Sequence, residues 1–432
     1  VIVFGSVLLM LPAATVPGEK TGLINAFFTA TSATCVTGLI VYDTATHFTF
    51  FGQLVILTLI QIGGLGIMTF SVSLALLMRR GVSMKDQSIM QDVLDQDTLQ
   101  SVKRLVGFII AMTFLLETAG ALILFKTWKP LFHGSAETAW HAIFHSVSAF
   151  CNAGFSTFSN SLMGFANDVP TNLTIGGLII LGGIGFVVIS DFYQAIRTRL
   201  FSRQKRRHKF RIQTRLVLGW TGGLILFGTG LFYWIEHKNL LEGMTLNNAL
   251  LVSLFQSITT RTAGFNSCTI GALQPATLFL FVVLMFIGAS PGGTGGGIKV
   301  TTPAVLWAVI RAGFRRRGET EIYRRTLPIE VIQKAVMVLC SSLLFICGAV
   351  GLMTFFEPDK DFLDLLFETV SAFGTTGLST GITSTLSEAG RILITLLMFI
   401  GRLGPLTIGF AFMLRRRQPA KYSYSEERIM IG

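Results

Sequence analysis

Four short segments of the sequence place small or polar residues directly before a glycine, at nearly constant spacing. The glycines are Gly38, Gly154, Gly264 and Gly377, and successive ones lie 110 to 116 residues apart. Rings of backbone carbonyl oxygens can replace the water around a monovalent cation, and glycine permits the backbone conformation that turns successive carbonyls inward. One motif recurring at one period indicates an internal repeat. The spacing therefore predicts a cation filter built from four parts of one chain.

The residues of this predicted filter are mostly small and uncharged. They are Thr34, Cys35, Val36, Thr37, Gly38, Cys151, Asn152, Ala153, Gly154, Arg261, Thr262, Ala263, Gly264, Gly374, Thr375, Thr376 and Gly377. A divalent-selective pore favours a ring of Asp or Glu, and an anion pore favours a ring of Lys or Arg. The predicted filter has no Asp or Glu, and Arg261 is its only basic residue. A glycine after a short helix is often just a helix end. Four copies in register favour the filter over that alternative.

A run of glycines interrupts the third copy of the pattern after its filter. The run is expected to hold a gate, made of Ala289, Ser290, Pro291, Gly292, Gly293, Thr294, Gly295, Gly296, Gly297 and Lys299. Gly and Pro at this density break a helix, so the segment is expected to obstruct the pathway beneath the filter. A kinked packing helix is the alternative. The phosphate-loop pattern is not met, because Ile298 separates Gly297 from Lys299.

Three further groups of ionisable residues lie in apolar stretches. Arg402 falls inside the last apolar run, where a charged side chain faces a cavity or a partner, or else snorkels to the interface. Glu117 is either a hydrogen-bonded structural carboxyl or a proton relay. His141 and His145 have the spacing of two metal ligands on one helix face. The sequence places no third ligand beside them, so a resident metal is not expected.

Composition places the chain in a membrane. It is 51% hydrophobic and 13% charged, with a mean hydropathy of +0.63, whereas ordinary globular chains have about 25% charged residues. Of the 35 Lys and Arg residues, 27 lie in stretches 79–104, 197–215, 299–334 and 415–428. By the positive-inside rule these stretches share the cytoplasmic side. The net charge of +12 is thus a topology signal that also suits membrane lipid, and no nucleic-acid partner is expected. The five Cys residues have no CxxC spacing, so neither a disulfide framework nor a zinc site is expected.

The predicted fold is an all-α integral membrane protein. It comprises four parallel helix–pore-loop–helix repeats around a central pore, with eight membrane helices and four re-entrant pore helices. The first helices are predicted at 1–16, 103–125, 212–235 and 330–356, the pore helices at 23–34, 138–150, 247–259 and 362–373, and the second helices at 51–78, 172–197, 275–313 and 388–414. A ten- to thirteen-residue apolar segment cannot span the bilayer, so each pore helix dips in and returns. Residues 1–12 are expected to be the remainder of a longer first membrane helix rather than a signal peptide.

The predicted repeats have these boundaries: 1–80, 100–200, 210–315 with the gating loop at 288–299, and 328–415, followed by a cytoplasmic tail at 416–432. Non-helical backbone at membrane depth is tolerated where it lines a cavity or is buried in protein. The segments between pore helix and second helix therefore require a central aqueous pathway.

With these motifs the chain resembles the Trk/Ktr/HKT family of potassium transporters, most closely its bacterial Ktr-type membrane subunits. The resemblance rests on the four filter segments and on the segments Gln61–Gly66, Gly182–Gly185, Gln256–Asn266, Glu368–Leu378 and Phe399–Pro405. In the family, a glycine at all four filter positions goes with selectivity for K⁺ over Na⁺, and serine at the first position with sodium permeability. Gly38 occupies that position here.

The resemblance implies further properties. The loop at 288–299 would act as the gate, and Arg402 would face the pore below the filter. The protein would be a homodimer with one pore per protomer, lying as a multi-pass protein in the bacterial inner membrane and joined to a cytoplasmic ring of RCK-type subunits that bind ATP or ADP. K⁺ would be the transported ion, sodium dependence would be a shared trait, and no organic cofactor is expected in this chain.

Two alternatives come from other functional classes. In an H⁺- or Na⁺-coupled cation symporter, an intramembrane acid such as Glu117 would couple the two fluxes. Carriers typically bind substrate at broken helices of inverted repeats, whereas the repeats predicted here are parallel. A membrane hydrolase is disfavoured because neither GxSxG nor HExxH occurs. An enzyme is therefore not expected.

Overall fold

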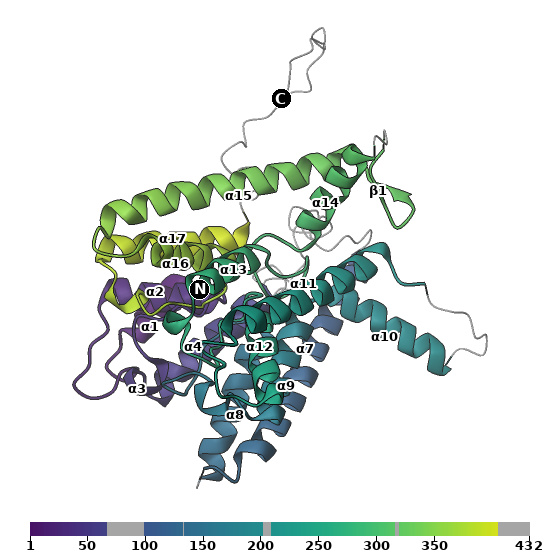
Figure 1. Cartoon of the computed structure of the whole chain (residues 1–432). Helices are drawn as coiled ribbons and strands as arrows, with labels where there is room; N and C mark the ends of the chain where they lie inside the picture. The colour runs from purple at the N-terminus through teal and green to yellow at the C-terminus, as the bar shows by residue number, and fades with distance from the viewer. Residues whose placement is uncertain (67–98, 133, 202–208, 316–318, 405–432) are drawn as a thin grey trace.

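The computed structural model describes residues 1–66, 99–132, 134–201, 209–315 and 319–404, almost entirely as helices (Figure 1). The α-helices are α1 (Ile2–Leu9), α2 (Leu23–Thr34), α3 (Thr44–His47), α4 (Phe50–Leu65), α7 (Leu99–Trp128), α8 (Ser135–Phe150), α9 (Val169–Gly183), α10 (Phe186–Phe201), α11 (Ile212–Glu236), α12 (Leu246–Thr259), α13 (Pro275–Phe286), α14 (Thr301–Phe314), α15 (Ile329–Phe356), α16 (Phe362–Gly374) and α17 (Glu388–Leu403). Three 3₁₀ turns (Met163–Phe165, Ile270–Ala272, Thr383–Thr385) and an antiparallel hairpin, β1 (Glu321–Ile322) with β2 (Arg325–Thr326), complete the described elements. The expected helical class is confirmed.

One order of helices recurs in four stretches of the chain, which we call segments 1 (1–66), 2 (99–201), 3 (209–315) and 4 (319–404). Each begins with a first helix (α1, α7, α11 or α15), continues with a short helix (α2, α8, α12 or α16) and ends with a second helix (α4, α9–α10, α13–α14 or α17). The short helices agree with the predicted pore-helix ranges to within three residues at either end.

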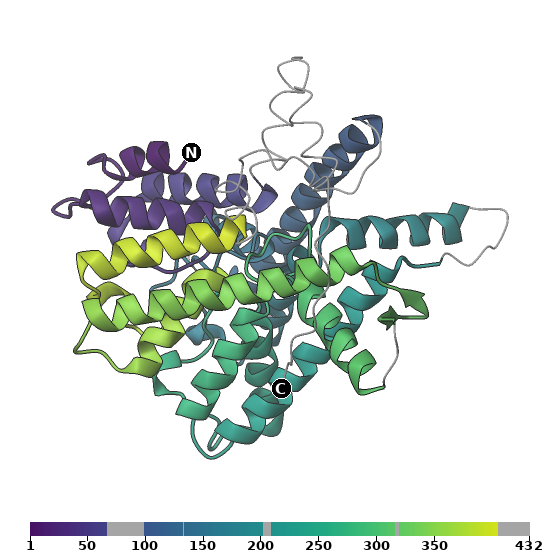
Figure 2. The ribbon, with the colours of Figure 1, turned by 90° about the horizontal axis from the view of Figure 1, so that it is seen from above.

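The segments close into a ring because each second helix packs on the short helix of the next segment. The contacting pairs are α4 with α8, α9 with α12, α13 with α16, and α17 with α2. The last pair joins the two ends of the described chain, and Figures 1 and 2 both show α17 beside α2. The closure gives the four filter sequences a common centre.

Local sequence signals fix where three of the second helices begin. The Thr49 hydroxyl accepts a hydrogen bond from the Gly52 amide at the start of α4, and Ser387 caps α17 in the same way through Gly390. The Asp168 carboxylate accepts from the Thr171 amide at the start of α9. Such side-chain caps satisfy amides that have no partner within the helix.

Fewer uninterrupted spans exist in the described residues than the eight predicted. Three helices are long and apolar enough to cross a membrane: Val106–Trp128, Ile212–Glu236 and Ile329–Phe356. The single helix predicted at 172–197 is wrong, since α9 and α10 meet at an angle of 101°. Gly185, at the break, has a φ of +90° that ends a right-handed helix.

The second helices of segments 1 and 4 end earlier than predicted within the described residues. α4 stops at Leu65 and α17 at Leu403, each followed by a glycine with a φ of +84°. The remainders of the predicted helices 51–78 and 388–414, and the tail 416–432, lie outside the described residues. α1 covers only part of the predicted helix 1–16, because turns follow Leu9.

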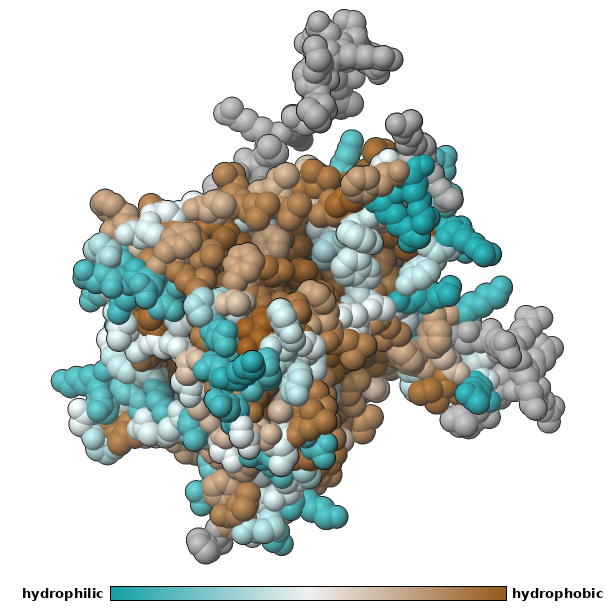
Figure 3. Space-filling view, in the orientation of Figure 1, coloured by the Kyte–Doolittle hydropathy of each residue, from teal (hydrophilic) through white to brown (hydrophobic). Residues whose placement is uncertain are grey.

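Hydrophobic residues cover much of the molecular surface around α15, whereas hydrophilic ones gather near the β1–β2 hairpin (Figure 3). On α15, Leu344 and Phe355 are 75% and 79% exposed. Apolar side chains exposed on a helix long enough to span the bilayer are suited to lipid contact.

Candidate functional site

The four motif glycines form a closed ring. Each glycine packs against the backbone of the residue that directly precedes the next motif glycine. A Cβ added at Gly38 would lie 2.5 Å from the carbonyl oxygen of Ala153, and one at Gly154 would lie 2.6 Å from that of Ala263. Cβ atoms at Gly264 and Gly377 would likewise meet the carbonyls of Thr376 and Thr37. We call this arrangement the glycine ring. No residue larger than glycine fits there without displacing neighbouring backbone.

The backbone repeats one unusual conformation at all four positions. The glycines have φ values of +94°, +71°, +79° and +87° in chain order. Two residues earlier in each segment, Val36, Asn152, Thr262 and Thr375 also have positive φ, from +49° to +64°. The intervening residues do not, so left-handed backbone alternates with other conformations. Such strain in non-glycine residues persists only where the surroundings enforce it, and it clusters at functional sites.

The short helices hold this backbone from behind. The amides of Thr37, Ala153 and Thr376 donate to carbonyls of the last helical turns, at 2.7–2.8 Å. In segments 1 and 4 the ring glycine's own amide donates to a serine hydroxyl six residues earlier, Ser32 or Ser371, at 3.1 Å. All four short helices therefore end beside the ring, and the partial negative charge of their C-termini favours a cation there.

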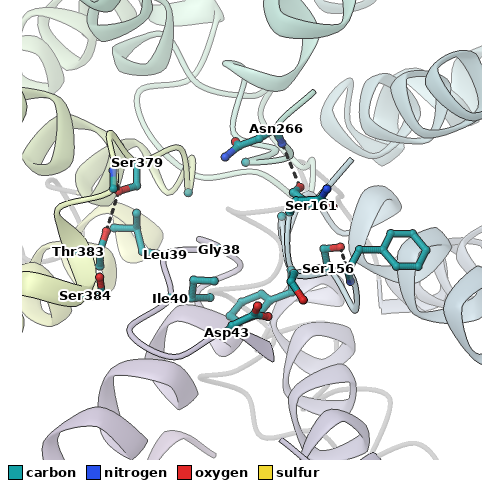
Figure 4. Close-up of a pocket in the computed structure, with 18 of the residues that line it drawn as sticks. Gly38, Leu39, Ile40, Asp43, Ser156, Ser161, Asn266, Ser379, Thr383 and Ser384 are labelled. Atoms are coloured by element: carbon teal, nitrogen blue, oxygen red, sulfur yellow. Dashed lines mark hydrogen bonds between the residues drawn. The ribbon is translucent and has the colours of Figure 1, made fainter. Parts of the chain in front are cut away.

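A cavity of about 380 Å³ opens on one side of the ring (Figure 4). We call it the vestibule. All four ring glycines line it, together with residues that follow them in each segment, among which are Ser156, Asn266 and Ser379. Of its lining residues, Asp43 alone is ionisable. The vestibule thus combines polar and apolar groups with one acidic residue, and it leads to the ring.

The loop at residues 287–300 lies against the other side of the ring backbone. The Gly296 amide donates to the Thr375 hydroxyl at 3.0 Å. Cβ atoms at Gly295 and Gly296 would collide with the hydroxyls of Thr262 and Thr375. Both threonines precede their ring glycines by two residues. The structure therefore places the predicted gate residues directly beside the predicted filter.

This loop is fastened to the broken helix of segment 2. The amides of Ser290 and Thr294 donate to the carbonyls of Gly183 and Gly182, at 2.9 and 3.1 Å. In return the Phe186 amide donates to the Gly292 carbonyl at 3.0 Å. The break between α9 and α10 thus frees backbone groups that bind the loop, which is why two interruptions in different segments occur together.

Arg402 joins the loop to segment 1. Its guanidinium is buried in part, and its two terminal nitrogens donate to the carbonyl oxygens of Thr294 and Gly63. Lys299 donates to the Gly295 carbonyl at 2.8 Å. Both predicted cations therefore bind main-chain carbonyls at the loop, where arginine's fork of donors can bridge two partners.

Two predicted filter residues turn their side chains away from the ring. The Arg261 guanidinium donates to the Thr221 carbonyl on α11 at 3.2 Å. The Cys151 thiol faces Gln61 and Glu117 on neighbouring helices, at 3.8 and 3.7 Å. Their backbones follow the short helices, but their side chains support the segments from behind.

The histidine pair and the glycine runs have structural contacts. His141 bonds to Thr157 at 2.6 Å and His145 to Ser156 at 2.8 Å. Within the described part of the chain, no group of three potential metal ligands occurs. Cβ atoms at Gly63 and Gly182 would meet the carbonyls of Thr34 and Phe150, so glycine allows close packing of the backbone at these two positions.

The sequence did not predict that polar residues of the short helices hydrogen-bond to the segments that follow the ring glycines. Gln256 donates to Ser267 at 3.0 Å, and Glu368 accepts from Ser379 and Thr383. A signal was available, because an acid, an amide and a histidine stand at equivalent places within otherwise apolar or small-residue helices. Their partners, however, lie across the glycine turn and were not predictable from helix periodicity.

A family model described as TrkH, a cation transport protein, matches residues 5–424 of the chain. The chain belongs to the TrkH family of cation transport proteins. It is 40% identical to Ktr system potassium uptake protein B of Bacillus subtilis, over 98% of this chain and 93% of that protein. It is 35% identical to potassium/sodium uptake protein NtpJ of Enterococcus hirae, over 100% of this chain and 94% of that protein. The resemblance to the Trk/Ktr transporters is confirmed.

A solved structure supports the fold of this TrkH family member. The crystal structure of the potassium transporter TrkH from Vibrio parahaemolyticus aligns with a TM-score of 0.72 at 19% identity, covering 95% of this chain and 83% of that one. With the apolar helices and the family match, the chain is an integral membrane protein of a potassium-uptake transporter family.

Proposed function

We propose that the chain is a K⁺-selective pore for potassium uptake, with the glycine ring as its filter. The single observation that carries this proposal is the repeated left-handed backbone at and before four glycines that contact one another in cyclic order. Filters of this kind replace hydration water with backbone oxygen, and all four positions hold glycine. In addition, the hydroxyls of Thr37 and Thr376 have no hydrogen-bond partner among the described residues, so their oxygens are available to a cation.

The loop 287–300 would obstruct the pathway and act as the gate. Its contacts with Thr375 and with the Gly182–Gly183 carbonyls place it next to the ring, and Arg402 fastens it to segment 1. Uptake would be driven by the inside-negative membrane potential, which is worth about 2.3 kcal/mol per charge per 100 mV. No covalent step is needed.

The membrane arrangement and the partners extend this proposal. Each segment would be one helix–pore-loop–helix repeat, entered by K⁺ from the vestibule side. The name of the Bacillus subtilis relative refers to a Ktr system, which supports an assembly of more than one kind of subunit. The assembly proposed here is a homodimer in the bacterial inner membrane with a separate nucleotide-binding RCK-type subunit. The name of the Enterococcus hirae relative includes sodium, which supports Na⁺ as a second transported or activating ion.

An H⁺- or Na⁺-coupled symporter is the second candidate, favoured by one observation. Glu117 is only 4% exposed on α7 and accepts a hydrogen bond from Gln61 at 3.3 Å beside the second filter segment. An acid buried at that place is typical of coupling sites in carriers. Its partners from two other helices also fit a purely structural role, so the pore remains the better-supported proposal.

Reversal potentials separate the two candidates. The purified chain in liposomes, with a tenfold K⁺ gradient, should reverse at the K⁺ equilibrium potential, about 59 mV, if K⁺ moves alone. A second series varies pH and Na⁺ at fixed K⁺ and should leave that potential unchanged. A reversal potential that moves with the proton or sodium gradient would establish coupling and overturn the pore proposal.

A further inference from the structure

The vestibule wall formed by segment 4 differs from the other walls because a buried carboxylate stands behind it. Glu368 has no exposed surface and lies on α16, nine residues before the ring glycine Gly377. Its carboxylate accepts hydrogen bonds from the hydroxyls of Ser379 and Thr383, the second at 3.0 Å, and from the backbone of Thr380. An ionised carboxylate only accepts hydrogen bonds, so these donors stabilise the charged form against the burial that disfavours it.

Ser379 and Thr383 also line the vestibule, on the wall opposite Ser156 (Figure 4). A hydroxyl has one hydrogen and two lone pairs. The Ser379 hydroxyl gives its hydrogen to the Glu368 carboxylate, and its oxygen already accepts from the Gly381 amide at 2.9 Å, which leaves one lone pair. The Thr383 hydroxyl directs its single hydrogen at Glu368 or at the Ser379 oxygen, 2.9 Å away, and keeps the lone pairs of its own oxygen. The wall therefore offers oxygen acceptors to the cavity, chiefly that of Thr383, which is what an alkali cation requires.

The equivalent positions in the other segments lack this combination. Aligned on their pore helices, Thr29, His145 and Gln256 stand where Glu368 stands in segment 4. The Thr29 hydroxyl has no partner in the described structure, and Gln256 donates its amide hydrogen to Ser267 at 3.0 Å, which leaves that hydroxyl free to donate. A carboxylate with two hydroxyls toward the vestibule thus occurs once among four otherwise similar walls.

The second segment resembles the fourth without the charge. The Nδ1 atom of His145 bonds to the His141 carbonyl at 2.8 Å, so Nδ1 carries the hydrogen. Nε2 then accepts from the Ser156 hydroxyl at 2.8 Å. Ser156 also lines the vestibule. Segments 2 and 4 lie opposite each other in the ring, so two walls present hydroxyl acceptors and only one has a carboxyl group behind it.

We propose that Glu368 is a positioning residue which holds the Ser379 and Thr383 hydroxyls as acceptors, and that they form an outer site where a partly dehydrated K⁺ binds before entering the ring. Asp43, the ionisable residue of the vestibule lining, adds negative charge on the segment 1 side. The site rests on the proposed function, since it supplies the same ion to the same filter.

Potassium uptake by the full chain in liposomes tests this site when external K⁺ is varied at a fixed inside-negative potential. The substitution Glu368→Gln gives the side chain a hydrogen to donate and removes the charge. It should raise the KM for K⁺ about tenfold while the maximal rate changes less than about twofold. Glu368→Asp keeps the charge and should recover a large part of the affinity. A role confined to stability would instead lower the maximal rate through loss of folded protein.

Thr383→Ala provides an independent arm, and Thr385→Ala is its matched control. Thr385 lies in the same 3₁₀ turn, is exposed, and bonds to Lys360 and Ile382 rather than to Glu368. Thr383→Ala should raise the KM several-fold, and Thr385→Ala should leave it unchanged. If Glu368→Gln does not yield folded protein by size exclusion, Thr383→Ala decides alone.

An unchanged KM in Thr383→Ala, or in a folded Glu368→Gln, would overturn the outer site. A wild-type chain that carries no K⁺ would instead overturn the proposed function. The two failures are therefore distinguishable, because one is seen in the variants and the other in the wild-type protein.

Discussion

At the scale of single residues, the ring glycines do something that no other residue could do. Each has a left-handed φ, and each lacks the room for a Cβ because a neighbouring segment's carbonyl occupies it. Gly18 shares the first property without the second: its φ is +98°, yet nothing lies within 4 Å of an added Cβ. A comparison of substitutions at a ring glycine and at Gly18 therefore separates the cost of backbone strain from the cost of a steric clash.

We expect Gly38→Ala to reduce the K⁺-to-Na⁺ permeability ratio about tenfold, because the added methyl group displaces the Ala153 carbonyl and widens the ring. Backbone strain should destabilise both Gly38→Ala and Gly18→Ala by about 1 kcal/mol. Reversal potentials under bi-ionic conditions measure the ratio. Equal selectivity in the two variants would show that the ring does not set it.

His47 gives the chain a pH-dependent stability outside the membrane-spanning helices. The side chain is 6% exposed, stacks on Tyr42 and bonds to the Thr21 hydroxyl at 2.9 Å. Burial lowers the pKa of His47 below 6.5, and the carboxylate of Glu19, 3.6 Å away, offsets this only in part. The unfolded chain therefore takes up a proton at a higher pH than the folded one.

The contribution of His47 is complete above about pH 6.5 and is lost as the pH falls below that value, through the lowered pKa of the folded state. We expect the melting temperature of the wild-type protein to fall more steeply between about pH 7.5 and pH 5 than that of His47→Gln. Thermal unfolding in detergent at a series of pH values measures this. Parallel curves for the two proteins would refute the assignment.

At the scale of elements, the ring is symmetric but its support is not. The four short helices approach it in the same way, whereas α13–α14 and α9–α10 are broken at places where the others are not. The two breaks bind each other through backbone hydrogen bonds, and Arg402 on α17 adds a link to α4. Any opening of loop 287–300 must therefore disturb its contacts with the three other segments.

We expect Arg402→Ala to increase K⁺ flux about tenfold, because it removes both a positive charge and the bridge between the Thr294 and Gly63 carbonyls. Arg402→Lys keeps the charge, but its single ammonium group does not reproduce the bridging fork. A flux near wild type in Arg402→Lys would assign the barrier to charge, and a raised flux would assign it to the bridge. Lower flux in Arg402→Ala at normal expression contradicts both.

At the scale of the whole molecule, the described residues are almost wholly helical. Across the described ranges the strands are β1 and β2, two residues each. Dinucleotide and mononucleotide sites of the Rossmann type need a parallel sheet flanked by helices. The described residues contain a candidate pathway and a candidate gate but no such sheet, which is consistent with the proposed nucleotide control through a separate subunit.

ATP and ADP should therefore leave K⁺ flux through the purified chain unchanged, and should alter it once a separate RCK-type subunit is added. K⁺ flux into liposomes is measured with and without that subunit. The control is the purified chain alone in the presence of ATP or of ADP. Calorimetric binding of ATP to the chain alone would contradict the prediction.

The sequence by itself determined the helical class, the positions of the short helices, the four glycines and the interruption in segment 3. These follow from local chemistry: apolar length, helix caps and glycine content act over a few residues and can be read from spacing. Even the break after Gly183 had a local signal in its glycines, although helix 172–197 was predicted as continuous.

Only the tertiary structure decided which groups meet. The contact of α17 with α2 closes the ring, the loop binds the broken helix of segment 2, and Glu368 reaches Ser379 across the glycine turn. The first two pairings depend on how the four segments stack around one axis, and the third depends on how the chain turns back between α16 and the residues after Gly377. Helical periodicity describes one face of one helix, so it contains no information about the partner across the pore.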